Sequence, residues 1–263
     1  MADTFRYILT LAKFKARYPA SSWVRITTIT MIAKLGQDIE LAAFREKFTP
    51  VNIRPKGSTA KGFEWTIKKT TFYNQITIGY RDQYSQKSIK IFPNGSVQVA
   101  GCADLFDCHR IMRQLCFIVN KTIGTEISSA QLVNSVAVKM INTNFSLNSS
   151  VNLNRVIQRF DGREEFRVSF DPDRYSAVKV KFQPRPGTKQ VTASIFSTGK
   201  IIVTGAQTLE EIALAYNTLN ANLDASVRLN ESEKKDEFGV IMGHTFMDWV
   251  PVLQAKGVEA WVA

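Results

Sequence analysis

The side chains best suited to metal binding or nucleophilic chemistry are few, and most lie in one short stretch. Cys102, Cys108, His109 and Cys116 lie close together, and His244 is the second histidine of the chain. Their spacing is not that of a zinc site, because no CxxC pair occurs. Cys108 and Cys116 fall in a segment that we expect to be one helix, so we interpret the cysteines as buried structural thiols.

Other catalytic patterns are equally weak. A Ser-His-Asp triad would have only two histidines to draw on. An acidic set could suggest a metal-dependent nuclease, although its Asp-Pro-Asp segment is typical of a turn before a strand. The sequence lacks a P-loop, a Rossmann glycine fingerprint and an HExxH motif. We therefore expect no enzyme activity, catalytic residue, metal or cofactor. The acidic set is Asp161, Glu164, Glu165, Asp171 and Asp173.

Charge points to a polyanionic partner. Lys and Arg number 34 against 23 Asp and Glu, which gives a net charge of +11. Residues 224–263 hold four basic and seven acidic side chains, so the positive charge belongs to the rest of the chain. Nucleic acid is the first partner to consider and an anionic membrane surface the second. No apolar stretch approaches the roughly 20 residues of a membrane span, and the N-terminus does not resemble a signal peptide.

The elements that would position a binding surface occur twice. Residues 72–80 and 174–182 both alternate apolar and polar side chains, as half-buried strands do. Residues 88–102 and 192–206 each contain two strand-like segments around a turn with Gly95 or Gly199. Each hairpin leads into an expected helix, 105–119 or 209–223, with Asp104 and Thr208 as N-caps. Thr208 and Glu211 also fit a capping box.

The repeat extends upstream. Residues 26–31 and 133–138 are both expected to be strands, followed by helices near 38–47 and 151–160. The predicted fold is therefore α+β, with two pseudo-symmetric β-α-β-β-β-α repeats and one possible extra strand at 63–69. We expect repeat 1 at 23–122 and repeat 2 at 123–223. An amphipathic basic helix precedes them in 1–22, which could pack on the repeats, touch DNA or contact a partner, and a protein-binding or helical extension follows in 224–263.

If the strands form one sheet with helices on one face, the other face stays open. Strand alternation places aromatic, small and basic side chains on this face in both repeats. An exposed face with aromatic side chains usually marks an interface. The expected residues are Tyr73, Gln75, Thr77, Lys90, Phe92, Gln98 and Ala100, then Tyr175, Ala177, Lys179, Lys181, Ser194, Phe196, Ile202 and Thr204.

One motif resembles a known family. Ile195-Phe-Ser-Thr-Gly-Lys-Ile-Ile-Val-Thr-Gly-Ala206 is similar to the hairpin and helix start of TATA-box-binding proteins, and Ile91-Phe-Pro-Asn-Gly-Ser-Val-Gln-Val-Ala-Gly-Cys102 is a weaker copy in register. The resemblance covers roughly residues 23–223. It implies a saddle, in which a curved antiparallel sheet carries helices on its convex face and binds the DNA minor groove with its concave face. The divergence resembles that of TATA-binding-protein-like factors from large cytoplasmic DNA viruses.

The resemblance also implies roles for single residues. The wedge pairs that unstack base steps fall on Tyr73 with Phe92 and on Tyr175 with Phe196, with Phe72 as a register alternative to Tyr73. The groove-floor positions fall on Thr27, Ile29, Gln98, Ala100, Asn134, Val136, Ile202 and Thr204. Phosphate contacts fall on Lys90, Lys179, Lys181, Arg185, Lys189 and Lys200. Thr27, Gln98 and Lys90 depart from the family pattern, and Tyr73 and Tyr175 replace its Phe.

The function implied is a transcription initiation factor that binds and bends AT-rich promoter DNA and presents it to a B-type initiation factor and RNA polymerase. The protein would act inside the cell, in the host cytoplasm if viral and otherwise in the nucleus. Two alternatives stay open. The same fold could grip RNA–DNA hybrids, single strands or DNA without sequence preference, or it could bind proteins with no DNA role.

Overall fold

The computed structural model describes residues 2–53, 63–69, 72–82, 85–231 and 246–260. The chain divides into two compact units. Residues 28–140 form the first-repeat unit, and residues 1–27 with 141–263 form the second-repeat unit. The strands β1 (Arg25–Lys34) and β7 (Ala137–Ser146) each contribute residues to both units.

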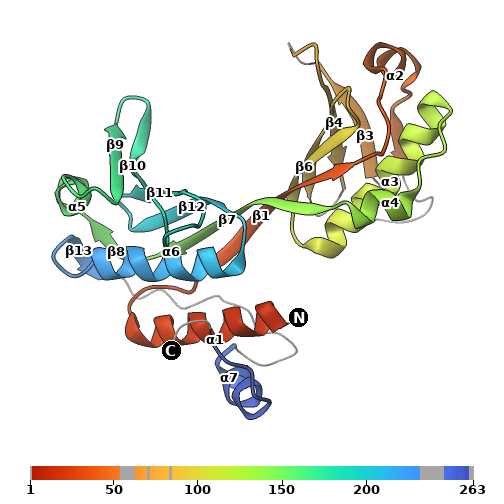
Figure 1. Cartoon of the computed structure of the whole chain (residues 1–263). Helices are drawn as coiled ribbons and strands as arrows, with labels where there is room; N and C mark the ends of the chain where they lie inside the picture. The colour runs from red at the N-terminus through yellow and green to blue at the C-terminus, as the bar shows by residue number, and fades with distance from the viewer. Residues whose placement is uncertain (1, 54–62, 70–71, 83–84, 232–245, 261–263) are drawn as a thin grey trace. The chain divides into compact units, whose positions relative to one another are not determined.

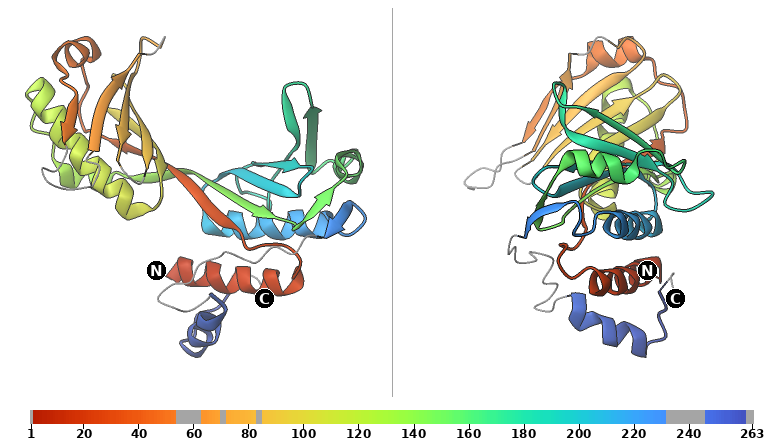
Figure 2. Two further views of the ribbon diagram at one scale, coloured as in Figure 1. Left: turned by 180° about the vertical axis from the view of Figure 1, so that it is seen from behind. Right: turned by 90° about the vertical axis from the view of Figure 1, so that its left-hand side faces the viewer.

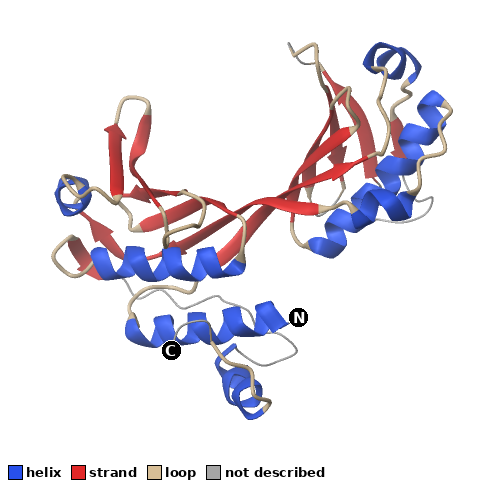
Figure 3. Cartoon of the chain, in the orientation of Figure 1, coloured by secondary structure: helices blue, strands red, loops and turns tan. Residues whose placement is uncertain are grey.

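The first-repeat unit is an antiparallel sheet with helices against it (Figures 1 and 3). Its strand order is β2-β3-β4-β5-β6-β1, so β2 is an edge strand. The long helix α3 packs against β6, and α2 and α4 both pack against α3. The elements are α2 (Leu41–Lys47), β2 (Val51–Ile53), β3 (Phe63–Lys68), β4 (Ile76–Arg81), β5 (Gln86–Ile91), β6 (Ser96–Cys102), α3 (Leu105–Ile123) and α4 (Ser129–Asn134).

The second-repeat unit repeats this plan with the strand order β7-β12-β11-β10-β9. The helix α6 packs against β12, while α5 packs against β9 and β10. A separate pair joins β8 to β13. The elements are β8 (Ser149–Val151), α5 (Leu153–Phe160), β9 (Phe166–Asp171), β10 (Tyr175–Phe182), β11 (Val191–Phe196), β12 (Lys200–Ala206), α6 (Leu209–Asn222) and β13 (Arg228–Glu231).

Both terminal segments add helices to the second-repeat unit. The helix α1 (Ala2–Arg17) packs on α6, and α7 (Phe246–Ala255) packs on α1 (Figure 2). Tyr18, just after α1, donates a hydrogen bond from its hydroxyl to Oδ1 of Asn217 at 3.1 Å. Of the three positions left open for the N-terminal helix, the structure shows packing on the repeat.

The two predicted hairpin turns share the same glycine geometry. Gly95 and Gly199 both have positive φ, and a Cβ on either would lie about 2.0 Å from a backbone carbonyl oxygen, of Gln37 or Ser149. Only glycine tolerates this combination of left-handed backbone and close approach. The capping box of Thr208 with Glu211 and the N-cap of Asp104 are likewise confirmed.

The upstream part of the repeat prediction was wrong. Residues 133–138 do not form a strand, because α4 runs to Asn134 and β7 begins only at Ala137. Ser128 caps α4 by accepting from the backbone N–H of Gln131, and Leu132 is buried. Ile32 of β1 pairs with Gln98, and Asn144 of β7 pairs with Ile202. Because Gln98 and Ile202 are equivalent positions of the two hairpins, Ile32 and Asn144 are equivalent residues of β1 and β7.

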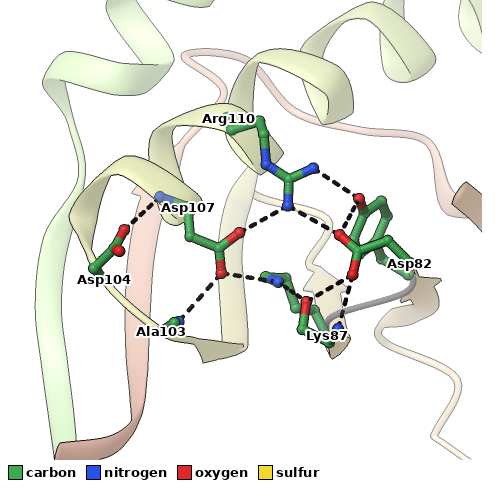
Figure 4. A network of polar contacts seen from close by, with 8 residues as sticks. Asp82, Lys87, Ala103, Asp104, Asp107 and Arg110 are labelled. Carbon is green, nitrogen blue, oxygen red and sulfur yellow. Dashed lines mark hydrogen bonds and ion pairs between the residues drawn. The ribbon is translucent and has the colours of Figure 1, made fainter. Parts of the chain in front are cut away.

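A buried charge network fixes α3 to the sheet of the first-repeat unit (Figure 4). The Lys87 ammonium, whose side chain is fully buried, lies 2.8 Å from a carboxylate oxygen of Asp107. Arg110 bridges Asp107, Asp82 and the hydroxyl of Tyr80. Burial alone would raise the pKa of Asp107, but hydrogen bonds from Lys87, Arg110 and the backbone of Ala103 hold that pKa below its usual value.

Candidate nucleic-acid interface

Each sheet has a helix-packed face and an open face, and the alternation of burial separates them. In the first-repeat unit, Ile89 and Val99 are fully buried, whereas Lys90 and Gln98 on the same strands are half-exposed. In the second-repeat unit, Ile201 and Val203 are buried while Ile202 is exposed. Large apolar side chains on one face only are what packing against α3 and α6 requires. The half-exposed positions therefore define the open face.

Register joins the open-face side chains into matching rows. The second-repeat row runs Lys179, Ser194, Ile202 and Asn144, each directly opposite the next on neighbouring strands. The first-repeat row runs Thr77, Lys90, Gln98 and Ile32 in the same way. Directly opposite residues in antiparallel strands share a face and lie within contact range. The structure thus brings the predicted floor residue Gln98 next to Lys90 in repeat 1, and it places Ile202 in one row with Lys179 in repeat 2.

The predicted aromatic pair of repeat 2 is in contact. The rings of Tyr175 and Phe196 meet edge to face with centroids 5.7 Å apart. The ammonium of Lys179 lies 4.7 Å from the centroid of the Tyr175 ring. Edge-to-face and cation–π geometry both hold aromatic rings in a fixed orientation. Two rings and one cation therefore occupy adjacent places on the open face.

The pair predicted for repeat 1 is arranged differently. Tyr73 is 86% exposed and precedes β4 in a turn, whereas Tyr175 begins β10. Phe92 is half-buried, and the described ring contacts do not join it to Tyr73. Phe72, the register alternative, is 61% exposed in the same turn. Arg45 holds this turn by donating to the carbonyl oxygen of Gln75 at 2.7 Å.

Three predicted floor residues do not lie on the open face. Asn134 ends α4, and Val136 lies in the turn that follows, with its N–H donating to the carbonyl of Val133. Ile29 shares the buried, helix-packed face of β1 with Met31 and Ala33, and it pairs with buried Cys102. The register irregularity beside it falls at Gly101 of β6, which has positive φ. Two other predicted floor residues, Thr204 and Ala100, are half-exposed on their strands. Ala177, which was also expected on the open face, is buried.

The residues that the sequence reasoning missed are Asn144 and Ile32. Asn144 is exposed on β7 opposite Ile202, and Ile32 is 37% exposed at the equivalent place on β1. In residues 141–145 the buried positions Ile141, Thr143 and Phe145 alternate with the more exposed Asn142 and Asn144. This alternation is a strand signal. Thr27, predicted as a floor residue, is exposed and donates from its hydroxyl to the carbonyl of Asn142 at 3.0 Å.

The basic residues divide into two groups. Lys179, Lys181 and Lys200 are exposed at open-face positions, and Lys181 lies opposite Thr192, whose other neighbour is Thr204. Arg185 instead forms an ion pair with Glu210 in the first turn of α6, at 2.7 Å. The backbone N–H of Lys189 donates to Glu211 of the same helix. The loop that carries Arg185 and Lys189 is therefore anchored to the helix.

The residues first considered for catalysis have structural places. Cys102, Cys108 and Cys116 are free thiols and buried, as expected. Burial raises the pKa of Cys116, and a hydrogen bond with Cys102 together with burial raises that of Cys108. His109 lies on α3, and His244 lies outside the described residues. Asp171 ends β9, and Asp173 lies in the expected turn before β10. The described part of the chain contains no cluster of His, Cys, Asp and Glu that could hold a metal ion.

No helix among the described residues has the length and apolar character needed to cross a membrane.

Comparisons with known proteins agree with this geometry. Residues 135–226 match the family model of "Transcription factor TFIID (or TATA-binding protein, TBP)". The chain is 27% identical over 232 residues to a TATA-box-binding protein-like protein of Acanthamoeba polyphaga mimivirus, covering 73% of this chain and 63% of that protein. It is 20% identical over 205 residues to TATA-box-binding protein 2 of Methanosarcina mazei, covering 78% of this chain and 97% of the relative.

A solved structure shows the same fold. The TATA-binding protein of Methanococcus jannaschii superposes with a TM-score of 0.52 at 14% identity, over 76% of this chain and 97% of that one. The match therefore extends over both repeats, whereas the family model covers repeat 2. The chain is therefore similar to TATA-box-binding proteins in sequence, most clearly over residues 135–226, and shares their fold.

Proposed function

We propose that this chain is a non-enzymatic transcription initiation factor that binds AT-rich promoter DNA in the minor groove and bends it. The observation behind the proposal is the pair Tyr175 and Phe196, which lies on the open face beside exposed lysines and within the residues that match the family. Aromatic wedges of this kind unstack a base step and kink the duplex, at a cost of a few kcal/mol per step that is offset by the extra contact surface.

The rest of the row explains a preference for A·T pairs. The minor groove presents only acceptors at A·T pairs, whereas G·C adds an amino group. Ile202 offers an apolar contact, and the amide of Asn144 can donate to base acceptors. The flexible T-A step is also the easiest to kink. Lys179, Lys181 and Lys200 would bind phosphates, which sets affinity and register rather than sequence preference.

The two repeats would contribute unequally. Repeat 1 places Thr77, Lys90 and Gln98 where repeat 2 has Lys179, Ser194 and Ile202, and Tyr73 is not stacked on Phe92 among the described contacts. We expect repeat 2 to insert the stronger wedge and repeat 1 to bind with weaker base preference. The bent complex would be presented to a B-type initiation factor and RNA polymerase, in the host cytoplasm if the protein is viral and otherwise in the nucleus.

A bending assay tests the proposal. A short duplex with a dye at each end and a central TATA-type site should shorten end to end when the protein binds, and a G·C-rich duplex should not. The double variant Tyr175→Ala/Phe196→Ala should lose the shortening but keep salt-sensitive binding. Phe106→Ala is the matched control, because Phe106 is exposed on α3, outside the open face. Equal binding to both duplexes without shortening would overturn the proposal.

The polar first-repeat row favours one further candidate. Lys90 and Gln98 are half-exposed and can contact sugar hydroxyls and phosphates more readily than an apolar floor can, whereas the predicted open-face residues Gln75 and Thr77 are buried. This row would suit an RNA–DNA hybrid or DNA bound without sequence preference. Competition between a hybrid and a TATA duplex of equal length separates the two functions, because a module of this second kind would favour the hybrid. A protein-binding role without DNA would leave both affinities weak at low salt.

A further inference from the structure

A cavity of about 650 Å³ lies on the helix-packed side of the first-repeat unit, on the opposite face of the sheet from the candidate interface. It is lined by α3, by the chain after α2 and by the edge strands β2 and β3. Its volume is within the range of about 300–1,000 Å³ that is typical of small-molecule sites.

The second repeat shows why this cavity exists. Trp65 lies opposite Tyr80 as Phe166 lies opposite Phe182, so Trp65 and Phe166 are equivalent positions. In repeat 2, Phe160 of α5 covers Phe166, with ring centroids 4.8 Å apart. In repeat 1, α2 packs against α3 instead. The indole of Trp65 therefore borders a cavity where its counterpart is covered by a phenylalanine.

Two buried polar atoms in the cavity wall have no hydrogen-bond partner within the described structure. They are the indole N–H of Trp65, whose side chain is fully buried, and Oε1 of Gln114 on α3. A buried polar atom without a partner costs about 1–3 kcal/mol. Both atoms are shielded from solvent, so a ligand in the cavity would meet the exposed side chains of the lining rather than these two atoms.

The charged and aromatic side chains of the lining indicate the chemical class of the ligand. Lys47, Arg113 and Lys121 line the cavity, and no acidic residue is among the described residues of the lining. Phe117, 68% exposed on α3, adds an aromatic side chain to the lining. Cations bind phosphate groups, and aromatic side chains stack on planar bases.

We propose that this cavity binds a nucleotide, with its base against the exposed ring of Phe117 and its phosphates on Arg113 and Lys121. A free nucleoside triphosphate and the end of a single-stranded nucleic acid carry the same chemistry, and the experiment distinguishes them.

The test is a calorimetric titration of the full chain with ATP, with UTP and with a short single-stranded oligonucleotide. We expect saturable binding of one ligand per chain. Arg113→Ala/Lys121→Ala changes only exposed side chains and should weaken binding at least tenfold. Phe117→Ala removes the exposed ring and should weaken binding several-fold. Arg6→Ala, which removes an exposed cation on α1 away from the cavity lining, is the matched control and should leave binding unchanged.

Each result of the titration either supports or overturns the nucleotide proposal. Binding of the triphosphates with this pattern supports a free-nucleotide site, and binding of the oligonucleotide alone with the same pattern supports a nucleic-acid end. No saturable binding, or binding that is insensitive to Arg113→Ala/Lys121→Ala, overturns the proposal. Capture of an acidic peptide but no nucleotide would also overturn it. Tyr175→Ala/Phe196→Ala should leave nucleotide binding intact, so failure of the bending model and failure of this one are distinguishable.

Discussion

The ammonium group of Lys179 lies 4.7 Å from the centroid of the Tyr175 ring, on the open face of repeat 2. This contact couples the cation that would meet a phosphate to the ring that would enter a base step. A fixed position for Lys179 reduces the side-chain entropy lost on binding, since the lysine is already ordered before DNA arrives.

Lys179→Gln should weaken binding to all duplexes by a similar factor and reduce the slope of log affinity against log salt by about 1. The measurement is fluorescence anisotropy over a series of salt concentrations. Arg185→Gln is the control, because Glu210 already holds Arg185 at 2.7 Å, and its slope should stay near that of the unmodified protein. A larger loss of slope with Arg185→Gln would show that the β10–β11 loop releases its arginine to DNA.

A pair of asparagine variants tests the corrected register. Asn144→Ala removes an exposed amide opposite Ile202 and should reduce the preference for a TATA duplex over a G·C-rich one by roughly tenfold, since a specific base contact contributes about 1–3 kcal/mol. Asn134→Ala changes the last residue of α4 and should leave that preference unchanged. The ratio of the two affinities is the readout. The reverse result would restore the residue predicted from the sequence.

The hairpins were predictable because short-range chemistry determines them. Gly95, Gly199 and the capping box of Thr208 with Glu211 each depend on neighbours within a few residues, and the structure confirms all of them. The strand predicted at residues 133–138 was wrong because alternating Val residues look strand-like in isolation. The pattern Ser128-Ser-Ala-Gln131 was the available helix signal, and it competes with that alternation.

Positions set by long-range register could not be predicted from local pattern. The irregularity opposite Ile29 and Thr30 turns Cys102 of β6 to the helix-packed face, and only the pairing of β1 with β6 reveals it. The packing of α2 on α3, which leaves Trp65 beside a cavity, is likewise a tertiary choice between two similar repeats. The similarity of the two repeats therefore predicts which helices and strands form better than it predicts which side chains lie at a functional site.

The N-terminal helix should contribute substantially to stability. Phe14 and Leu11 of α1 are each 3% exposed in the second-repeat unit, where α1 packs on α6. Phe14→Ala should lower the free energy of unfolding by about 3–5 kcal/mol, the usual cost of removing a buried ring. Denaturant unfolding followed by circular dichroism measures the change. Arg6→Ala, on the exposed side of the same helix, should stay within about 0.5 kcal/mol.

The network around Asp107 should make the first-repeat unit sensitive to acid. Because the pKa of Asp107 in the folded protein lies below the ordinary value of 3.8 for an aspartate, ionised Asp107 stabilises the fold above that pH. The contribution is lost as the pH falls below 3.8 and through the folded pKa, where protonation leaves the buried Lys87 ammonium without its counter-ion. Unfolding free energies measured between pH 7 and pH 3 should therefore decline more steeply in the unmodified protein than in Asp107→Asn.

Asp107→Asn also has a predicted cost at neutral pH. Removing one charge from a buried pair typically costs about 3–5 kcal/mol, because the remaining charge is left uncompensated. Lys87→Met/Asp107→Asn removes both charges and should recover part of that loss, since the Met side chain fills the lysine's apolar surroundings without a charge. Glu165→Gln, which breaks the exposed ion pair with Arg163, is the control and should change stability little. A double variant no more stable than Asp107→Asn alone would show that the network stabilises α3 through its hydrogen bonds to Tyr80 and Asp82 rather than through the Lys87–Asp107 charge pair.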